Sequence, residues 1–328
     1  MSIPLDSPTQ HQGPKITIEN DYLKSLQQRY AFATILIPFF GLVIAIYTTF
    51  KFGISPVEIG LFMVMYTLTM LGITVGFHRH FAHCAFASNT ILRVLLAILG
   101  SMSAQGPVIQ WASIHRRHHK YSDRPGDPHS PLIYQGEKWG TLRGLWHGQV
   151  AWMLNSDVTN TAVFAKDLLR DPIITKVNRL YLTWVVVGLA IPAILDGLFT
   201  WTWTGILQGF LWGGLVRIFC VNHAFWTINS IAHCYGQRPF DTEEYSHNTF
   251  WLSLANFGEA WHNNHHAFPH SALLGLKWWQ IDIGGWVILA LKKVGLVWDL
   301  KTPTAGMITE KLNVHKQPEY SKLDVNNF

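Results

Sequence analysis

Long apolar runs without charged residues limit what this chain can fold into. The first run, AFATILIPFFGLVIAIYTTF at residues 31–50, has no charged side chain. A helix of about 20 apolar residues crosses a hydrocarbon core of about 30 Å. Because backbone polar groups in lipid must be hydrogen-bonded within the segment, such a run predicts a membrane-spanning helix. We predict four spans, arranged as two hairpins, at about 31–50, 57–77, 180–196 and 198–220.

The composition supports a membrane protein. Charged residues make up 14% of the chain, whereas soluble domains average about 25%. The chain has 15 tryptophans, a residue that gathers at membrane interfaces. Its three cysteines are scattered and give no disulfide framework or iron–sulfur motif. No basic block is interleaved with stacking aromatics, so we expect a lipid bilayer and no nucleic acid as partner.

The segment 94–114, VLLAILGSMSAQGPVIQWASI, is also uncharged. Its apolar part is short, and GSMSAQGP then brings small, polar and helix-breaking residues. If the segment crossed the membrane, the histidines before it and after it would face opposite sides. We therefore predict an interfacial or re-entrant piece and no fifth span.

Basic residues predict the orientation. Lys15, Lys24 and Arg29 precede the first span, and the segment 78–179 carries twelve Lys and Arg residues. The connection between the first two spans has only Lys51, and that between the last two has none. By the positive-inside rule, both termini and the central segment should be cytoplasmic.

The predicted fold is therefore an all-α membrane protein, with its helices in two hairpins below a cytoplasmic helical cap. We expect a cytoplasmic N-terminal tail at 1–30, a membrane domain at 31–300 and a C-terminal tail at 301–328. A bacterial inner membrane is the expected location.

Histidines cluster on the predicted cytoplasmic side. The motifs GFHRHFAH, HRRHH and GEAWHNNHH carry most of them, and NSIAH adds one more. Residues spaced i, i+3, i+4 share one face of a helix, so each HxxHH should offer three imidazoles to one small volume. The candidate metal ligands are His78, His83, His115, His118, His119, His233, His262, His265 and His266.

Nine imidazoles exceed the four ligands of a tetrahedral zinc site. They fit two metal ions with four or five nitrogens each, and imidazole suits iron, copper, zinc and nickel. A redox metal is favoured because hydrolytic sites usually recruit a carboxylate base. The role of His147 stays open: it either supports the metal ligands or lies at the membrane interface. Core or surface roles are expected for His11, His80, His129, His223, His247, His270 and His315.

The sequence resembles the integral-membrane fatty acyl desaturases, the stearoyl-CoA desaturase-like family with three histidine boxes. Within that family it is more similar to bacterial members than to animal ones. The motifs that carry the resemblance are GITVGFHRHFAH, HRRHHKYSDRPGDPHSP, WTINSIAHCYG and GEAWHNNHHAFPHSA, with DLLRDPIITKVNRLY before the third span. They occur in the family's order over roughly residues 30 to 300.

The resemblance implies a di-iron centre held by the nine histidines, with Asn229 holding an iron-bound water. It also implies a reaction in which O₂ and two electrons remove two hydrogens from a long acyl chain, usually at C9–C10, to leave a cis double bond. Carboxylates that orient the imidazoles are expected nearby, and Asp123, Asp127 and Glu259 are the candidates.

Two departures from the family pattern leave the partners open. Animal enzymes carry an Arg-Asp pair where this chain has Ser113 and Ile114, so the acyl carrier stays open among coenzyme A, acyl-carrier protein and membrane lipid. No haem or ferredoxin motif is fused, so electrons must come from a separate ferredoxin, rubredoxin or cytochrome b5 with its reductase. Four basic residues form a rim around the second histidine cluster: Arg116, Arg117, Lys120 and Arg124. This rim is either a solvated face or a docking surface for the acyl carrier or the redox partner.

Other functions share parts of this pattern. A related di-iron enzyme could hydroxylate the chain, make an alkyne or remove the carboxyl carbon, and the histidine boxes would be the same. A membrane metal-binding or transport protein is less favoured, because transport needs polar residues inside the spans and only Arg217 lies deep in one.

Overall fold

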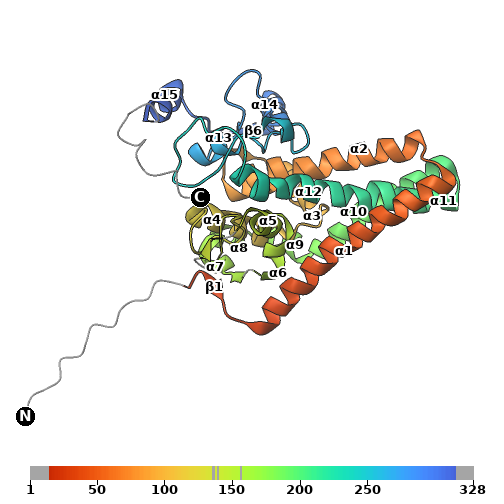
Figure 1. Cartoon of the computed structure of the whole chain (residues 1–328). Coiled ribbons are helices and arrows are strands. Elements are labelled where there is room, and N and C mark those ends of the chain that lie inside the picture. Colours follow the sequence, from red (N-terminus) through yellow and green to blue (C-terminus); the bar gives the residue numbers. More distant parts are fainter. Residues whose placement is uncertain (1–14, 135–136, 139, 156, 315–328) are drawn as a thin grey trace, which may run out of the picture.

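Four long apolar helices run side by side at one end of the molecule, and the remaining elements form a cap at the other end (Figure 1). The computed structural model describes residues 15–134, 137–138, 140–155 and 157–314. The prediction of a helical protein with four membrane-spanning candidates is confirmed. The first run is α1 (Asp21–Phe52), and the second consists of α2 (Pro56–Leu71) and the π-helix η1 (Gly72–Ala82). The third run is α10 (Tyr181–Thr200). The fourth consists of α11 (Trp203–Gly209), the π-helix η3 (Phe210–Val216), α12 (Arg217–Ser230) and the 3₁₀ turn η4 (Ile231–His233).

The first helix begins earlier than the apolar run that predicts it. Asn20 caps α1 by accepting a hydrogen bond from the Leu23 amide at 3.0 Å, and no helix-breaking residue separates this cap from the run. Residues 21–30, predicted to belong to a tail, are therefore helical. They extend the first helix toward the cap.

The turn between the third and fourth runs lies a few residues later than predicted. Asp196 does not end α10 but is buried within it, where Gly209 of α11 comes so close that an added Cβ would lie 2.6 Å from the Cβ of Asp196. The chain reverses at Trp201, which adopts a left-handed conformation with φ 53°. Thr202 then caps the next helix by accepting from the Gly205 amide at 2.9 Å.

The outer surface of the four runs is apolar. Large side chains such as Phe40, Phe50 and Val186 are more than half exposed, as expected where lipid is the solvent. Trp201 and Trp203, both 86% exposed, stand at the turn farthest from the cap, where interfacial aromatics are common.

Arg217 lies within the long helices and is fully buried. Its guanidinium donates to the backbone carbonyls of Met102 at 2.6 Å, Gly188 at 3.0 Å and Gly213 at 3.2 Å. The charge therefore joins three elements through carbonyl oxygens. These contacts give Arg217 a structural role in packing the long helices.

The uncharged segment 94–114 forms parts of two helices, α3 (Thr90–Ser101) and α4 (Val108–Tyr121). The turn between them contains Ala104 and Gly106 with positive φ values of 62° and 107°. At 1.5 Å per residue the twelve residues of α3 extend about 18 Å, short of a hydrocarbon core of about 30 Å. Its length fits the predicted interfacial or re-entrant piece.

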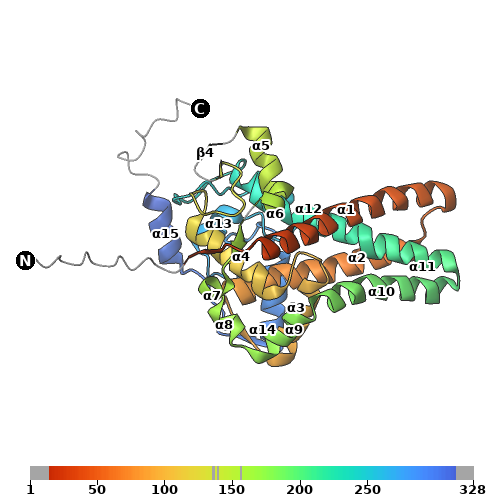
Figure 2. The same ribbon diagram turned by 90° about the horizontal axis from the view of Figure 1, so that it is seen from below.

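The cap combines short helices with three two-stranded ribbons (Figure 2). Antiparallel pairs join β1 (Thr17–Ile18) with β5 (Val158–Thr159), β2 (Ala87–Ser88) with β6 (Val297–Trp298), and β3 (Ile133–Tyr134) with β4 (Glu137–Lys138). The helical elements are α5 (Thr141–Trp146), the π-helix η2 (His147–Ala151), α6 (Trp152–Asn155), α7 (Thr161–Phe164), α8 (Lys166–Leu169), α9 (Pro172–Arg179), the 3₁₀ turn η5 (Phe250–Leu252), α13 (His262–Ala267), α14 (Ile283–Lys293) and α15 (Ala305–Val314).

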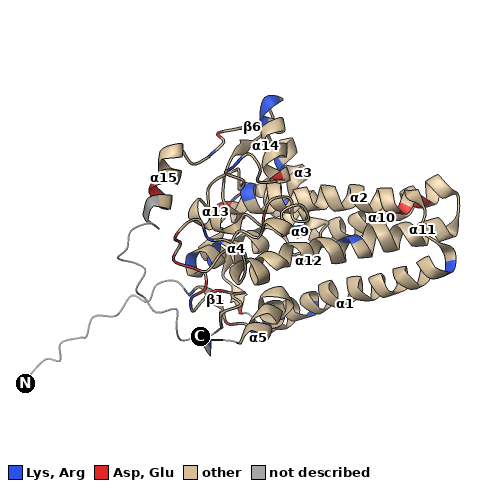
Figure 3. Ribbon diagram, turned by 45° about the horizontal axis from the view of Figure 1, so that its top comes forward, with Lys and Arg blue, Asp and Glu red and all other residues tan. Residues whose placement is uncertain are grey.

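Charged residues are frequent in the cap and sparse along the long helices (Figure 3). The segment 301–328, predicted as a tail, contains α15 (Ala305–Val314) in its described part. Lys311 of this helix donates to the Ala267 carbonyl at 2.5 Å and lies 4.9 Å from the centre of the Phe268 ring. These contacts fix α15 to the end of α13.

Candidate metal centre

Four parts of the chain carry the nine predicted ligands to one place between the long helices and the cap. His78 lies on η1, His83 directly after it and His233 at the end of η4. The two HxxHH triplets lie on α4 and α13. The structure therefore brings all nine predicted histidines together.

The π-helix aligns the first pair. Since π-helical hydrogen bonds join residues five apart, the His83 amide donates to the His78 carbonyl at 3.1 Å. The two rings lie 4.9 Å apart, edge to face. In an α-helix residues five apart would diverge around the axis, and the π-helical turn places both imidazoles on one face.

The ring nitrogens form two sets. The larger set has five histidines: His78, His83, His115, His119 and His265. Within it, Nε2 atoms approach at 2.7 Å between His83 and His115, 2.8 Å between His265 and His119, and 3.0 Å between His78 and His265.

The smaller set has four histidines: His118, His233, His262 and His266. The Nε2 atom of His262 lies 2.9 Å from that of His233 and 3.0 Å from that of His266. The expectation that each HxxHH serves one small volume is therefore wrong. Helix α4 gives two histidines to the larger set and one to the smaller, and α13 does the reverse, because a residue at i+3 leans to the other side of the helix from i and i+4.

The packing of these nitrogens fits a bound cation in each set. His78 and His118 direct Nδ1 to carboxylates, so in the neutral ring Nε2 carries the lone pair. A single hydrogen on His262 Nε2 cannot form hydrogen bonds to the Nε2 atoms of both His233 and His266. Lone pairs converging at 2.7–3.0 Å repel one another unless a positive ion lies among them. Four or five imidazoles match the donor sets of first-row transition metals.

Burial keeps six of these imidazoles neutral. Desolvation, followed by the charges of neighbouring histidines, lowers the pKa well below the ordinary histidine value for His83, His115, His119, His262, His265 and His266. Neutral imidazole is the form that binds metal ions, because protonation occupies the coordinating lone pair.

Carboxylates hold the outer nitrogens, as the sequence predicts for Asp123, Asp127 and Glu259. His118 Nδ1 donates to Asp127, whose two oxygens both lie 3.0 Å away, and Asp123 accepts from His233 Nδ1 at 2.8 Å. Glu259 lies 2.5 Å from His78 Nδ1. Although burial opposes its ionisation, the charge of His233 and its hydrogen bond lower the pKa of Asp123 below the usual range. The three carboxylates turn the inner nitrogens toward the two sets.

Several further residues support this centre, and the sequence pattern did not indicate them. Arg79, fully buried, pairs with Glu259 at 3.2 Å and with Asp282 at 2.7 Å. Glu244 lies 3.7 Å from His266 Nδ1, and His270 Nδ1 bonds the His83 carbonyl at 2.9 Å. Asp282 and Glu244 come from irregular loop sequence, so no periodic pattern could have indicated them.

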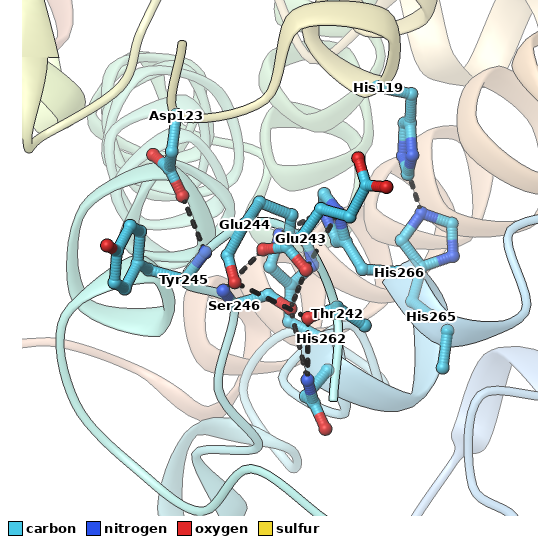
Figure 4. A network of polar contacts seen from close by, with 12 residues as sticks. His119, Asp123, Thr242, Glu243, Glu244, Tyr245, Ser246, His262, His265 and His266 are labelled. Atoms are coloured by element: carbon cyan, nitrogen blue, oxygen red, sulfur yellow. Dashed lines mark hydrogen bonds and ion pairs between the residues drawn. The ribbon is translucent and has the colours of Figure 1, made fainter. Parts of the chain in front are cut away.

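The loop before α13 closes one side of the smaller set (Figure 4). Asp123 also accepts from the Tyr245 amide at 2.9 Å and from the Ser130 hydroxyl at 2.6 Å. Figure 4 shows Glu244 and Ser246 in this loop beside His266 and His262. The loop thereby fixes the carboxylate that orients His233.

Two other histidines lie near the centre. His147, for which a supporting role was left open, is buried outside both sets and bonds the Pro128 backbone. His129, for which a core or surface role was expected, lies with its ring 4.3 Å from that of His118 at an interplanar angle of 32°. Neither ring belongs to the two sets.

The predicted basic rim divides into two kinds of residue. Arg117 is buried and donates to the Gly126 carbonyl at 2.8 Å. Arg116 is half-buried and pairs with Asp167 at 2.6 Å, so both arginines stabilise the cap. Lys120 and Arg124 are exposed, and Arg124 pairs with Glu243 at 2.7 Å.

Two adjoining cavities lead to the larger set. The inner cavity, of about 40 Å³, touches His115 and Asn229. The outer cavity, of about 440 Å³, lies between α1, the turn before α4 and the start of α10. Residues that line both mark where they meet: Gln105, Ile114, Trp152 and Met153.

Several known proteins are similar to this chain in sequence. The fatty acid desaturase family model matches residues 55–290. A hex-5-enoyl-[acyl-carrier protein] acetylenase of Moorena producens is 49% identical over 320 residues, covering 95% of this chain and 99% of the relative. An sn-1 stearoyl-lipid 9-desaturase of Synechocystis is 34% identical over 257 residues, covering 77% and 74%. A protein with the same description from Anabaena variabilis is 32% identical over 267 residues, covering 80% and 91%.

The family match spans all nine clustered histidines and well over half of the chain. The relatives agree in class with the resemblance that the histidine boxes carry. The chain therefore belongs to the fatty acid desaturase family, whose members are oxidoreductases that act on acyl chains.

Proposed function

We propose that this protein is an O₂-dependent di-iron enzyme that removes two hydrogens from neighbouring carbons of an acyl chain. The observation that carries the proposal is the pair of inward-facing histidine sets, five and four nitrogens in number. The nine histidines would hold the irons, one in each set, and Asn229, at the wall of the inner cavity, would hold an iron-bound water. Bound iron would supply the redox chemistry, in which O₂ is reduced to water with two electrons from outside and two from the chain.

The protein's own residues would bind and shield the chain. Trp111 stacks on His115 with ring centres 5.2 Å apart and an interplanar angle of 16°. Its Nε1 donates to Gln105 at 3.2 Å, which fixes the indole as one wall of the inner cavity. Phe225 closes the adjacent wall, 5.7 Å from Trp111. Apolar walls around the ligands would exclude water from the reacting carbons.

The carrier is proposed to be acyl-carrier protein or a membrane lipid. Where animal family members have Arg-Asp, Ser113 is fully buried and donates to the Ile109 carbonyl at 2.7 Å, and Ile114 lines both cavities. Neither side chain offers a charge to coenzyme A. The relatives named above are described for acyl-carrier-protein and lipid substrates.

The long helices are proposed to lie in the bacterial inner membrane, with the cap, the histidine sets and both termini on the cytoplasmic side. Support comes from the Lys and Arg residues, which favour the cap end of the helices (Figure 3). A separate ferredoxin, rubredoxin or cytochrome b5 would deliver electrons there. Of the predicted docking residues, Lys120 and Arg124 are the exposed ones.

A second candidate is the formation of a triple bond from a double bond. It is favoured by the acetylenase relative, which matches this chain over nearly its whole length. The cis double bond at C9–C10, which the family resemblance implies, is supported by the 9-desaturase relatives and stays a prediction. Both reactions remove two hydrogens and use the same metal centre.

The test combines metal analysis with product analysis. Detergent-purified protein is reloaded with ferrous iron, supplied with O₂, reduced ferredoxin and acyl-carrier-protein thioesters or acyl lipids, and the chains are examined by mass spectrometry. Two irons per chain and products lighter by two hydrogens are expected. A hydroxylated product or one shorter by a carbon would mean a related di-iron reaction, and zinc alone with unchanged chains after reloading would refute the proposal.

A further inference from the structure

The inner cavity is small on the scale of an acyl chain. Its volume is about 40 Å³, and a water-sized group needs about 10–15 Å³ by this measure. The space therefore holds about three or four methylene-sized groups. Because His115 and Asn229 line it, these groups are the ones that meet the metal ligands.

Aromatic side chains line this inner space. Phe225 and Trp226 of α12 are 6% and 3% exposed, and both line the inner cavity without lining the outer one. Trp111 completes the wall and is held by its stack on His115. Each ring packs against other buried groups, so lengthening the cavity requires removing one of them.

The outer cavity is larger, and none of the nine clustered histidines lines it. Leu23, Leu26 and Ala31 of α1 form an apolar side, whereas Arg179, which is exposed, gives the cavity a charged edge. A thioester or ester headgroup prefers this polar edge, and the apolar chain prefers the interior. The chain would therefore enter through the outer cavity with its methyl end leading.

We propose that the enzyme acts at the methyl end of its acyl substrate, within about the last four carbons. This inference rests on the proposed function and narrows its substrate. For a saturated end the balance is R–CH₂–CH₃ + O₂ + 2e⁻ + 2H⁺ → R–CH=CH₂ + 2H₂O, and a terminal alkene would give R–C≡CH in the same way. The electrons come from the external one-electron donor. A mid-chain bond of an octadecanoyl chain would require half of the chain to lie beyond the metals.

A chain-length series tests this without any variant. Iron-loaded protein is given hexanoyl, decanoyl and octadecanoyl thioesters of acyl-carrier protein, the corresponding acyl lipids and their terminal alkenes, and the position of each new multiple bond is determined. We expect unsaturation in the last four carbons for every chain that reacts. Unsaturation at C9–C10 of the octadecanoyl chain would overturn the inference and leave the proposed function intact. No product from any chain at full iron content would overturn both.

Cavity variants provide a second test. Trp226→Leu and Phe225→Ala should lengthen the inner cavity and move the new bond away from the methyl end by one to three carbons. Trp212→Leu is the matched control, because Trp212 lies on η3 of the same helical run outside both cavities, and its product should be unchanged. An unchanged bond position in both cavity variants would contradict the role of these walls.

Binding gives a readout that needs no turnover. Zinc-loaded protein cannot reduce O₂, and its affinity for a linear acyl thioester can be compared with that for a thioester ending in a tert-butyl group. We expect the bulky end to weaken binding at least tenfold, and Trp226→Leu to restore most of the loss. Equal affinity for both thioesters would show that the methyl end does not enter the inner cavity.

Discussion

His118 and His119 are neighbours in the chain but belong to different histidine sets. Their rings lie 5.5 Å apart at 74° to each other. His119 Nε2 lies 2.8 Å from His265 Nε2, whereas His118 directs Nδ1 to Asp127 and its Nε2 has no hydrogen-bond partner among the described residues. Helix α4 therefore joins the two candidate metal positions, so neighbouring substitutions can be used to separate them.

Substituting His118 with alanine should remove one metal and spare the other. The smaller set would keep three histidines, and the larger set would be intact. We expect iron content to fall from two per chain toward one, with activity reduced at least 100-fold and the helical signal in circular dichroism unchanged. His223→Ala, a half-buried histidine of α12 outside both sets, is the control. Two irons per chain and normal turnover in His118→Ala would contradict the nine-ligand assignment.

The carboxylate beside His118 should tune metal affinity without contacting the metal. Asp127→Asn keeps the shape but removes the charge that orients His118, and the loss of such supports typically weakens metal binding about 10–100-fold. Chelator competition measures the effect. Asp167→Asn is the control, because it removes a carboxylate that pairs with Arg116 and contacts no clustered histidine. Its iron affinity should be unchanged. An equal loss of iron affinity in both variants would indicate general destabilisation.

The buried pair between Arg79 and Asp282 should contribute strongly to stability. Asp282 also accepts hydrogen bonds from the amides of Leu274 at 2.7 Å, Gly275 at 3.2 Å and Gly285 at 2.8 Å. Asp282→Ala therefore removes one of the two carboxylates that pair with Arg79 and the acceptor of three backbone amides. Breaking a buried pair in this way costs about 3–5 kcal/mol.

Thermal unfolding in detergent tests this cost. The control is Asp157→Ala at the exposed contact with Lys24, 3.6 Å long, where about 0–1 kcal/mol is expected. Similar losses in the two variants would rule out a special contribution from the buried pair.

The metal-free protein should lose stability as pH falls below about 6.5. Six clustered histidines have pKa values held well below that ordinary value by burial and by one another. The unfolded chain therefore takes up protons first, and this favours unfolding by about 1.4 kcal/mol per pH unit for each such histidine. The Tm of metal-free protein between pH 7.5 and 5 measures this slope, and His119→Ala should make it shallower. A flat profile would mean that the folded cluster binds protons readily.

The sequence by itself was enough to predict the class of fold and the nine histidines that cluster in the structure. Uncharged runs such as 31–50 can satisfy their backbone groups in lipid only as helices, so the four spans follow from composition and length. Local spacing also indicated the histidines on α4 and α13, because i, i+3 and i+4 positions are close on any helix. The carboxylates Asp123 and Asp127 lie within a few residues of the second box, so proximity in the chain was a sufficient signal.

Tertiary structure decided what depends on contacts between distant segments. In each HxxHH triplet the spacing separates the i+3 histidine from those at i and i+4, but the way α4 and α13 face each other decides which set each histidine joins. Sequence spacing carries no information about that relative rotation. The support of Glu259 by Arg79 and Asp282 spans about two hundred positions. The size of the inner cavity likewise depends on rings from α4, α6 and α12 that meet only when the helices pack. Local periodicity can place a side chain on a helix face, but only the packed fold determines which side chain it meets.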